Sequence, residues 1–182
     1  MRYMIASDIH GSAFWCGRML ERFHEEKADR MILLGDLLNH GPRNDLPDGY
    51  APKQVIAMLS PLRSRILCVR GNCEAEVDQM VLPFPVLADY ALMEVRGHLL
   101  FITHGHLWNI DHMPPLSGGD MLLYGHTHVP LCEERDGILC LDPGSVALPK
   151  EGSWHGYMTL EDGLFLWKDM DGSERMRRAF EQ

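Results

Sequence analysis

One short apolar segment constrains the fold of this chain more than any other stretch of its sequence. Residues 31–34 read Met-Ile-Leu-Leu, and Gly35 and Asp36 follow them directly. A continuous apolar run of this length is typical of a strand that is buried on both faces of a sheet. Ligands of open α/β sheets gather at the carboxyl ends of such strands, so Asp36 is predicted to belong to a functional site.

The same arrangement recurs along the chain. Apolar strands are predicted over residues 2–7 and 65–69, and again over 98–103 and 120–124. Each of these strands is followed within a few residues by carboxylate, imidazole or amide side chains. The polar residues that follow the strands are Asp8, His10, Asp36, Asn72, His104, His126 and His128.

The order of the remaining elements predicts the fold class. A helix is expected over 12–27, with Ser12 as its N-cap and Trp15, Met19 and Phe23 as its buried stripe. A second helix is expected over 52–62, a loop over 39–52, and hairpins over 88–103 and 157–167. The tail from Asp171 is expected to be loosely structured, with solvated arginines. Together these elements predict an α+β fold, a four-layer α/β/β/α sandwich in which two mixed β-sheets pack together between helices.

Length and charge narrow the classes of function. The 182 residues fit a single domain, 1–182. The formal charge of −9 argues against binding of long nucleic acid, whereas small anionic substrates fit if a metal site supplies positive charge. No apolar run is long enough to span a bilayer, and the first residues lack a secretory leader pattern, so we expect a cytoplasmic protein without a membrane partner.

The polar residues at the strand ends match the ligand preferences of divalent metals. Mixed carboxylate, amide and imidazole ligands suit manganese, iron, nickel or zinc. Seven ligands are too many for one ion, but two ions about 3.5–4 Å apart and bridged by Asp36 would use them all. Taken alone, Asp8 and His10 also fit a strand-end turn, and the histidines at 104 and 106 also fit surface positions. Their joint occurrence behind apolar strands favours the metal site.

Five motifs carry a resemblance to a known family: Asp8-Ile9-His10, Gly35-Asp36, Gly71-Asn72-Cys73-Glu74, His104-Gly105-His106 and Gly125-His126-Thr127-His128. In this order they resemble the calcineurin-like metallophosphoesterases, and the 39–44 loop resembles the small bacterial phosphodiesterases of the YfcE type. The resemblance implies a sandwich of two β-sheets, a binuclear centre that often holds manganese, and a metal-bridging hydroxide that attacks phosphorus. One ion would be bound by Asp8, His10, Asp36 and His128, and the other by Asp36, Asn72, His104 and His126.

Four further residues near these motifs, His40, Arg43, Cys73 and His106, are candidates for contacts with the substrate or with the metal ligands. Many family members have histidine where this chain has Cys73, so we expect weak assistance to the leaving group. His106 is expected to contact substrate or a ligand residue rather than bind metal. His40 and Arg43 follow the bridging Asp36, and Arg43 is either solvated or a contact for a phosphate oxygen. The Asp142-Pro143-Gly144-Ser145 turn is expected to support the site without touching metal.

The resemblance implies a metal-dependent phosphodiesterase that hydrolyses small phosphodiesters. The residues expected to act in the reaction are Asp36, Asn72, Cys73 and His104. Two alternatives remain at this point: a phosphomonoesterase of the same family, which Cys73 disfavours, and a non-catalytic protein-binding scaffold of the same fold, which the intact ligand set disfavours. Trp154 and Trp167 are expected to be exposed, which leaves a homo-oligomer open, although single surface aromatic residues are common and do not establish one.

Overall fold

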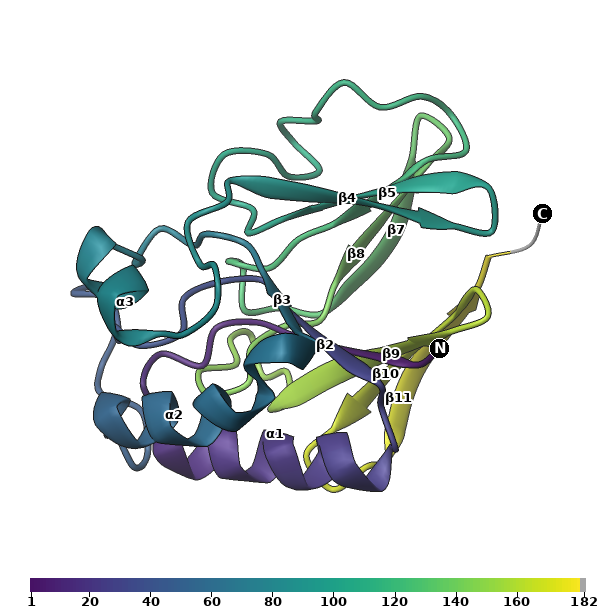
Figure 1. Cartoon of the computed structure of the whole chain (residues 1–182). Helices are drawn as coiled ribbons and strands as arrows, with labels where there is room; N and C mark the ends of the chain where they lie inside the picture. The colour runs from purple at the N-terminus through teal and green to yellow at the C-terminus, as the bar shows by residue number, and fades with distance from the viewer. Residues whose placement is uncertain (181–182) are drawn as a thin grey trace.

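Two mixed β-sheets stack face to face in the computed structural model, which describes residues 1–180 (Figure 1). The first sheet contains, in spatial order, β11 (Glu174–Ala179), β10 (Leu164–Asp169), β9 (Gly156–Glu161), β1 (Tyr3–Ala6), β2 (Arg30–Leu33) and β3 (Ile66–Cys68). The second contains β4 (Tyr90–Val95), β5 (His98–Thr103), β6 (Met121–Leu123), β8 (Ile138–Asp142) and β7 (Leu131–Arg135). The predicted sandwich of two mixed sheets and both predicted hairpins are confirmed.

The apolar runs of the central strands reflect burial on both faces. Met4 and Ala6 of β1 pack in the cluster that includes the helices, whereas Ile5 packs in the cluster between the two sheets. Because side chains alternate along a strand, both faces need apolar residues when both are covered. β3 departs from this pattern because it lies at the edge of its sheet, and its Leu67 is exposed.

Helices cover the outer face of the first sheet (Figure 1). They are α1 (Ala13–Glu25) and α2 (Pro52–Leu59), which continues as the 3₁₀ helix η1 (Ser60–Arg65). Ser12 is the N-cap of α1, since its Oγ accepts a hydrogen bond from the Trp15 N–H at 3.1 Å. Met19 and Phe23 are buried as predicted, but Trp15 is only partly buried and stacks on His155 with ring centroids 3.6 Å apart.

The outer face of the second sheet is covered by a loop instead of a helix. Residues 104–120 contain no helix and cross this face, which leaves the outermost layer thinner than the predicted sandwich (Figure 1). Trp108, Ile110 and Met113 of the loop pack against two buried residues, Phe101 of β5 and Tyr124, which directly follows β6. Apolar side chains of an irregular segment therefore cover this face of the sheet, as an amphipathic helix would.

Three elements were not expected from the sequence. These are the strand β7, the short helix α3 (Glu76–Val81) and the edge strand β11. The expectation of a loose tail was wrong, because β11 pairs antiparallel with β10 from Leu164 to Lys168. Its arginines are ion-paired: Arg175 Nε lies 2.8 Å from Asp169 Oδ2, and Arg178 Nη2 lies 3.0 Å from Glu134 Oε2.

Trp167 is fully buried, so the expectation that it is exposed was wrong. Its indole N–H donates to the main-chain carbonyl of Asp142 at 2.7 Å, which ties β10 to the end of β8. Trp154 is half-buried. Within residues 1–180, none of the helices has the length and apolar character needed to cross a membrane.

Candidate metal centre

The seven candidate ligands meet where the strands of both sheets end. Main-chain hydrogen bonds hold these strand ends together, because Asp8 N–H donates to Gly35 O at 3.2 Å and His10 N–H donates to Asp36 O at 2.8 Å. Across the two sheets, the His126 N–H donates to Asp8 Oδ2 at 3.1 Å. Segments more than a hundred residues apart in sequence thus form one site.

The backbone at this site is unusual. Five of the candidate ligands have positive φ angles: Asp8 (60°), His10 (48°), Asp36 (55°), His126 (70°) and His128 (65°). Left-handed backbone is uncommon for residues other than glycine, and it persists only where surrounding contacts impose it. Its concentration here indicates that the fold holds these side chains in directions that a regular strand does not offer.

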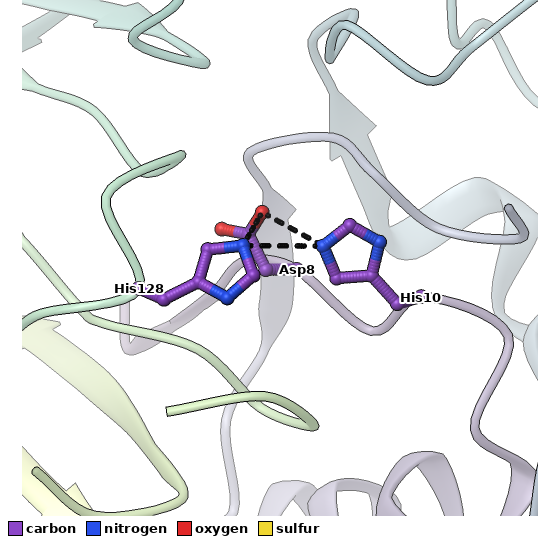
Figure 2. A group of neighbouring side chains, drawn as sticks. All are labelled: Asp8, His10 and His128. Carbon is purple, nitrogen blue, oxygen red and sulfur yellow. Dashed lines mark hydrogen bonds and ion pairs between the residues drawn. The ribbon is translucent and has the colours of Figure 1, made fainter. Parts of the chain in front are cut away.

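The first group of ligands is formed by Asp8, His10 and His128 (Figure 2). Each histidine donates its Nδ1–H to a main-chain carbonyl, at 2.8 Å for His10 with Asn39 and at 2.6 Å for His128 with Leu148. The two Nε2 atoms therefore face each other, 3.2 Å apart, and lie 3.4 and 3.2 Å from Asp8 Oδ1. Asp8 Oδ1 is buried and has no hydrogen-bond partner among residues 1–180. The lone pairs of these two nitrogens and of Asp8 Oδ1 thus point toward one another, an arrangement that a bound cation would stabilise.

The second group is formed by Asn72, His104 and His126. His104 donates its Nδ1–H to the carbonyl of Leu34 at 2.7 Å, so its Nε2 points into the site. That Nε2 lies 3.1 Å from Asn72 Oδ1 and 3.2 Å from His126 Nδ1. An imidazole nitrogen and an amide oxygen that face each other as acceptors again fit a bound cation.

Asp36 lies between the two groups. Its Oδ2 is 3.7 Å from His10 Nε2 and 3.6 Å from His104 Nε2, and the carboxylate is 2% exposed. Its Oδ1 accepts the Cys73 N–H at 2.9 Å. One oxygen of Asp36 is thus fixed by the backbone, and the other is equally placed toward both groups, which is the geometry of a bridging carboxylate.

The pKa shifts of His126 and Asp8 suit metal binding. Burial would lower the pKa of His10, but its contact with Asp8 outweighs burial and raises that pKa. Burial, followed by the charge of His104, lowers the pKa of His126 to about 4, so its imidazole is neutral at neutral pH. Burial would raise the pKa of Asp8, but contacts with His10 and His128 outweigh it and hold that pKa well below its usual range. Neutral imidazoles and ionised carboxylates are the forms that ligate divalent ions.

A family model of the calcineurin-like phosphoesterase superfamily domain matches residues 1–162. The chain belongs to the calcineurin-like phosphoesterase superfamily. It is 46% identical to phosphodiesterase YfcE of Escherichia coli (strain K12) over 164 residues, which cover 90% of this chain and 89% of that protein. A solved structure of YfcE, described as a phosphoesterase, matches over the whole of both chains with a TM-score of 0.96 at 43% identity. Vps29 from Entamoeba histolytica also matches over both chains, with a TM-score of 0.65 at 20% identity, which shows a shared fold alone.

Glu74 anchors the backbone at Asp36, the candidate bridging residue of this phosphoesterase, and sequence reasoning did not single it out. Its carboxylate accepts three main-chain N–H groups, from Asp36 at 2.8 Å, Leu37 at 2.7 Å and Gly71 at 2.6 Å. Burial and then the charge of Asp36 raise the pKa of Glu74 to about 7. The only signal in the sequence was its place in the Gly71–Glu74 motif, two residues after the candidate ligand Asn72.

The Asp142–Ser145 turn supports the phosphoesterase site as predicted. Asp142 accepts the Thr127 hydroxyl at 2.8 Å, which holds the segment between His126 and His128. Ser145 donates its hydroxyl to the Asp8 carbonyl at 2.9 Å. The turn therefore fixes two ligand-bearing segments through hydrogen bonds.

A cavity of about 330 Å³ opens above the candidate ligands. Cys73 and Arg43 line this cavity, and so does Lys150, which sequence reasoning missed. His40 does not line it and packs edge-on against Tyr50, with ring centroids 5.4 Å apart. The remaining residues of the wall are His10, Asp36, Gly41, Pro42, Asn44, Asn72, His126 and His128.

His106 also lies outside the cavity wall. Its ring centroid is 5.4 Å from that of His104 and 6.3 Å from that of His126. His106 therefore lies beside two candidate ligands, and the expectation that it contacts a ligand residue or substrate rather than metal stays a prediction.

Proposed function

We propose that this protein is a metal-dependent phosphodiesterase of small phosphodiesters, with a binuclear centre bridged by Asp36. The observation that carries the proposal is the position of Asp36 Oδ2, which is 3.7 Å from His10 Nε2 and 3.6 Å from His104 Nε2. The 46% identity to phosphodiesterase YfcE supports the choice of diesters. Two divalent ions in such a centre supply a hydroxide nucleophile near neutral pH and neutralise charge on the phosphoryl group.

In this proposal the seven ligand residues hold the ions, and Mn²⁺ is the expected metal. Asp8, His10, Asp36 and His128 bind one ion, and Asp36, Asn72, His104 and His126 bind the other. The hydrogen bonds from Nδ1 of His10, His104 and His128 to main-chain carbonyls keep each Nε2 free and aimed into the site. Ni²⁺, Fe²⁺ and Zn²⁺ fit the same oxygen and nitrogen ligands.

Metal removal and replacement test the proposal. Protein stripped with a chelator should not hydrolyse bis(4-nitrophenyl) phosphate, and Mn²⁺ should restore turnover, because the uncompensated acceptors of the site need a cation. The diester should be hydrolysed faster than 4-nitrophenyl phosphate under the same conditions. Faster monoester turnover would favour a phosphomonoesterase. Binding of two ions without any hydrolysis would favour a scaffold.

Cys73 should limit the reaction to good leaving groups. Burial and then the nearby charge of Asp36 raise the pKa of its thiol, so it stays protonated at neutral pH and is a poor acid. Cys73→His should place a group with a pKa of about 6.5 there and make the rate less dependent on the leaving group. The measurement is the slope of log kcat/KM against leaving-group pKa for substituted phenyl diesters.

Cys73→Ser is the matched control, since a hydroxyl also holds its proton at neutral pH. It should keep the slope of the parent protein. An unchanged slope in Cys73→His, with metal content retained, would show that position 73 does not assist the leaving group.

A further inference from the structure

Two cationic side chains line the cavity above the candidate metal centre, Arg43 and Lys150. In the part of the chain that the structure describes, neither side chain forms a salt bridge or donates a hydrogen bond, whereas Arg30, Arg65 and Arg96, which also lack a salt bridge, donate to main-chain carbonyls. The chain as a whole carries a formal charge of −9. Two uncompensated cations at the opening of one cavity favour an anionic ligand there.

Each cation lies on a loop that also orients a candidate ligand of the first group. Asn39, four residues before Arg43, supplies the carbonyl that accepts from His10. The main-chain N–H of Lys150 donates to the carbonyl of His128 at 3.1 Å, on the loop whose Leu148 carbonyl accepts from the His128 ring. The backbone under both cations is thus tied to the first group of ligands.

The rest of the cavity wall offers little apolar surface. Apart from the candidate ligands and the two cations, it consists of Gly41, Pro42, Asn44 and Cys73. No phenylalanine, tyrosine, tryptophan, leucine or isoleucine of residues 1–180 is among the lining residues. Apart from Pro42 and the histidines of the candidate ligand set, no lining side chain offers a surface for a nucleobase, aryl or acyl group, so charge and hydrogen bonds are the main means of recognising the part of the substrate beyond the scissile phosphate.

We infer that Arg43 and Lys150 bind a second anionic group of the substrate, so that the preferred substrates are phosphodiesters whose retained portion carries a phosphate, phosphonate or carboxylate. This inference rests on the proposed phosphodiesterase activity. A simple diester has one negative charge, which two divalent ions bound by Asp8 and Asp36 already offset. The positive charges of Arg43 and Lys150 would be compensated by a second anionic group of the substrate on the same side of the site.

Three diesters with the same 4-nitrophenyl leaving group test the inference. Their other substituent ends in a phosphonate, a hydroxyl or a quaternary ammonium group. With Mn²⁺-loaded protein, kcat/KM for the phosphonate diester should exceed that for the hydroxyl diester by about tenfold, and the advantage should shrink as salt is raised. In the Arg43→Gln/Lys150→Gln double variant, the ratio of these two values should fall to about one. Lys53→Gln removes an exposed lysine of α2 outside the cavity and should keep the ratio.

A binding measurement separates recognition from turnover. Calorimetry should show that the parent protein binds 3-phosphonopropionate about tenfold more tightly than propylphosphonate, and the double variant should bind the two about equally. The inference is overturned if the double variant keeps the parent's ratios, or if it loses turnover of all three diesters by the same factor. If the parent hydrolyses none of the diesters, the proposed function fails instead, and the calorimetric ratio still decides whether the two cations bind an anion.

Discussion

Asp36→Asn should lower diester turnover by roughly a thousandfold while leaving the fold intact. Asparagine keeps an oxygen that can accept the Cys73 N–H, now 2.9 Å from Asp36 Oδ1, and it tolerates the left-handed φ of 55°. What it loses is the anionic Oδ2 that lies 3.7 and 3.6 Å from the two histidine nitrogens. Because one oxygen serves both groups, the bound metal should fall from two ions per chain to one or fewer.

The metal-free variant should be at least as stable as the metal-free parent. Removing the charge of Asp36 relieves its repulsion of the buried Glu74, whose pKa that charge helps to raise to about 7. Metal content by elemental analysis, thermal unfolding and kcat/KM together test this pattern. Asp162→Asn is the matched control, because Asp162 has a similar φ of 50° in an exposed turn, and it should leave all three unchanged. Full turnover by Asp36→Asn with two ions bound would contradict the bridging role.

The sequence predicts those elements whose pattern of apolar and polar residues matches their burial in the folded protein. β1 and β2 are buried on both faces, so their side chains are apolar at every buried position and their ends are marked by glycine or aspartate. The candidate ligands were found because they follow such strands directly. No contact between distant segments was needed to place Asp8 or Asp36 at a strand end.

The parts that were missed depend on contacts between distant segments. β11 contains Arg175, Arg177 and Arg178 and looks like a loop, because an edge strand gains its structure from pairing with its neighbour. Trp167 lies on a strand of alternating burial, and a period of two does not show which face is covered. Glu74 acts on Asp36 from 38 residues away, so its role appears only when the two loops meet.

Gly71→Ala should lower both stability and metal affinity, because Gly71 lies directly against the carboxylate of Asp36, the proposed bridging ligand. A Cβ built at this position would lie 2.1 Å from Asp36 Oδ1, 2.5 Å from Asp36 N and 2.7 Å from Glu74 Oε2. None of these atoms can move without cost, since Asp36 N donates to Glu74 and Asp36 faces both ligand groups. We expect a loss of about 1–3 kcal/mol in the free energy of unfolding and a fall in kcat/KM of roughly 10- to 100-fold.

Gly118→Ala separates this steric effect from the general cost of replacing a glycine. Gly118, like Gly71, has no positive φ, but its added Cβ would have only Asp136 O nearby, at 3.9 Å. Denaturant unfolding of the metal-free proteins, followed by Mn²⁺ titration, should show no loss for Gly118→Ala and a clear loss for Gly71→Ala. If Gly71→Ala bound two ions with parental affinity, the close packing against Asp36 would not be what holds the bridging oxygen in place. If Gly71→Ala kept its Mn²⁺ affinity but lost stability, Gly71 would matter for folding and not for metal binding. The two measurements together therefore decide whether the contact with Asp36 shapes the metal centre.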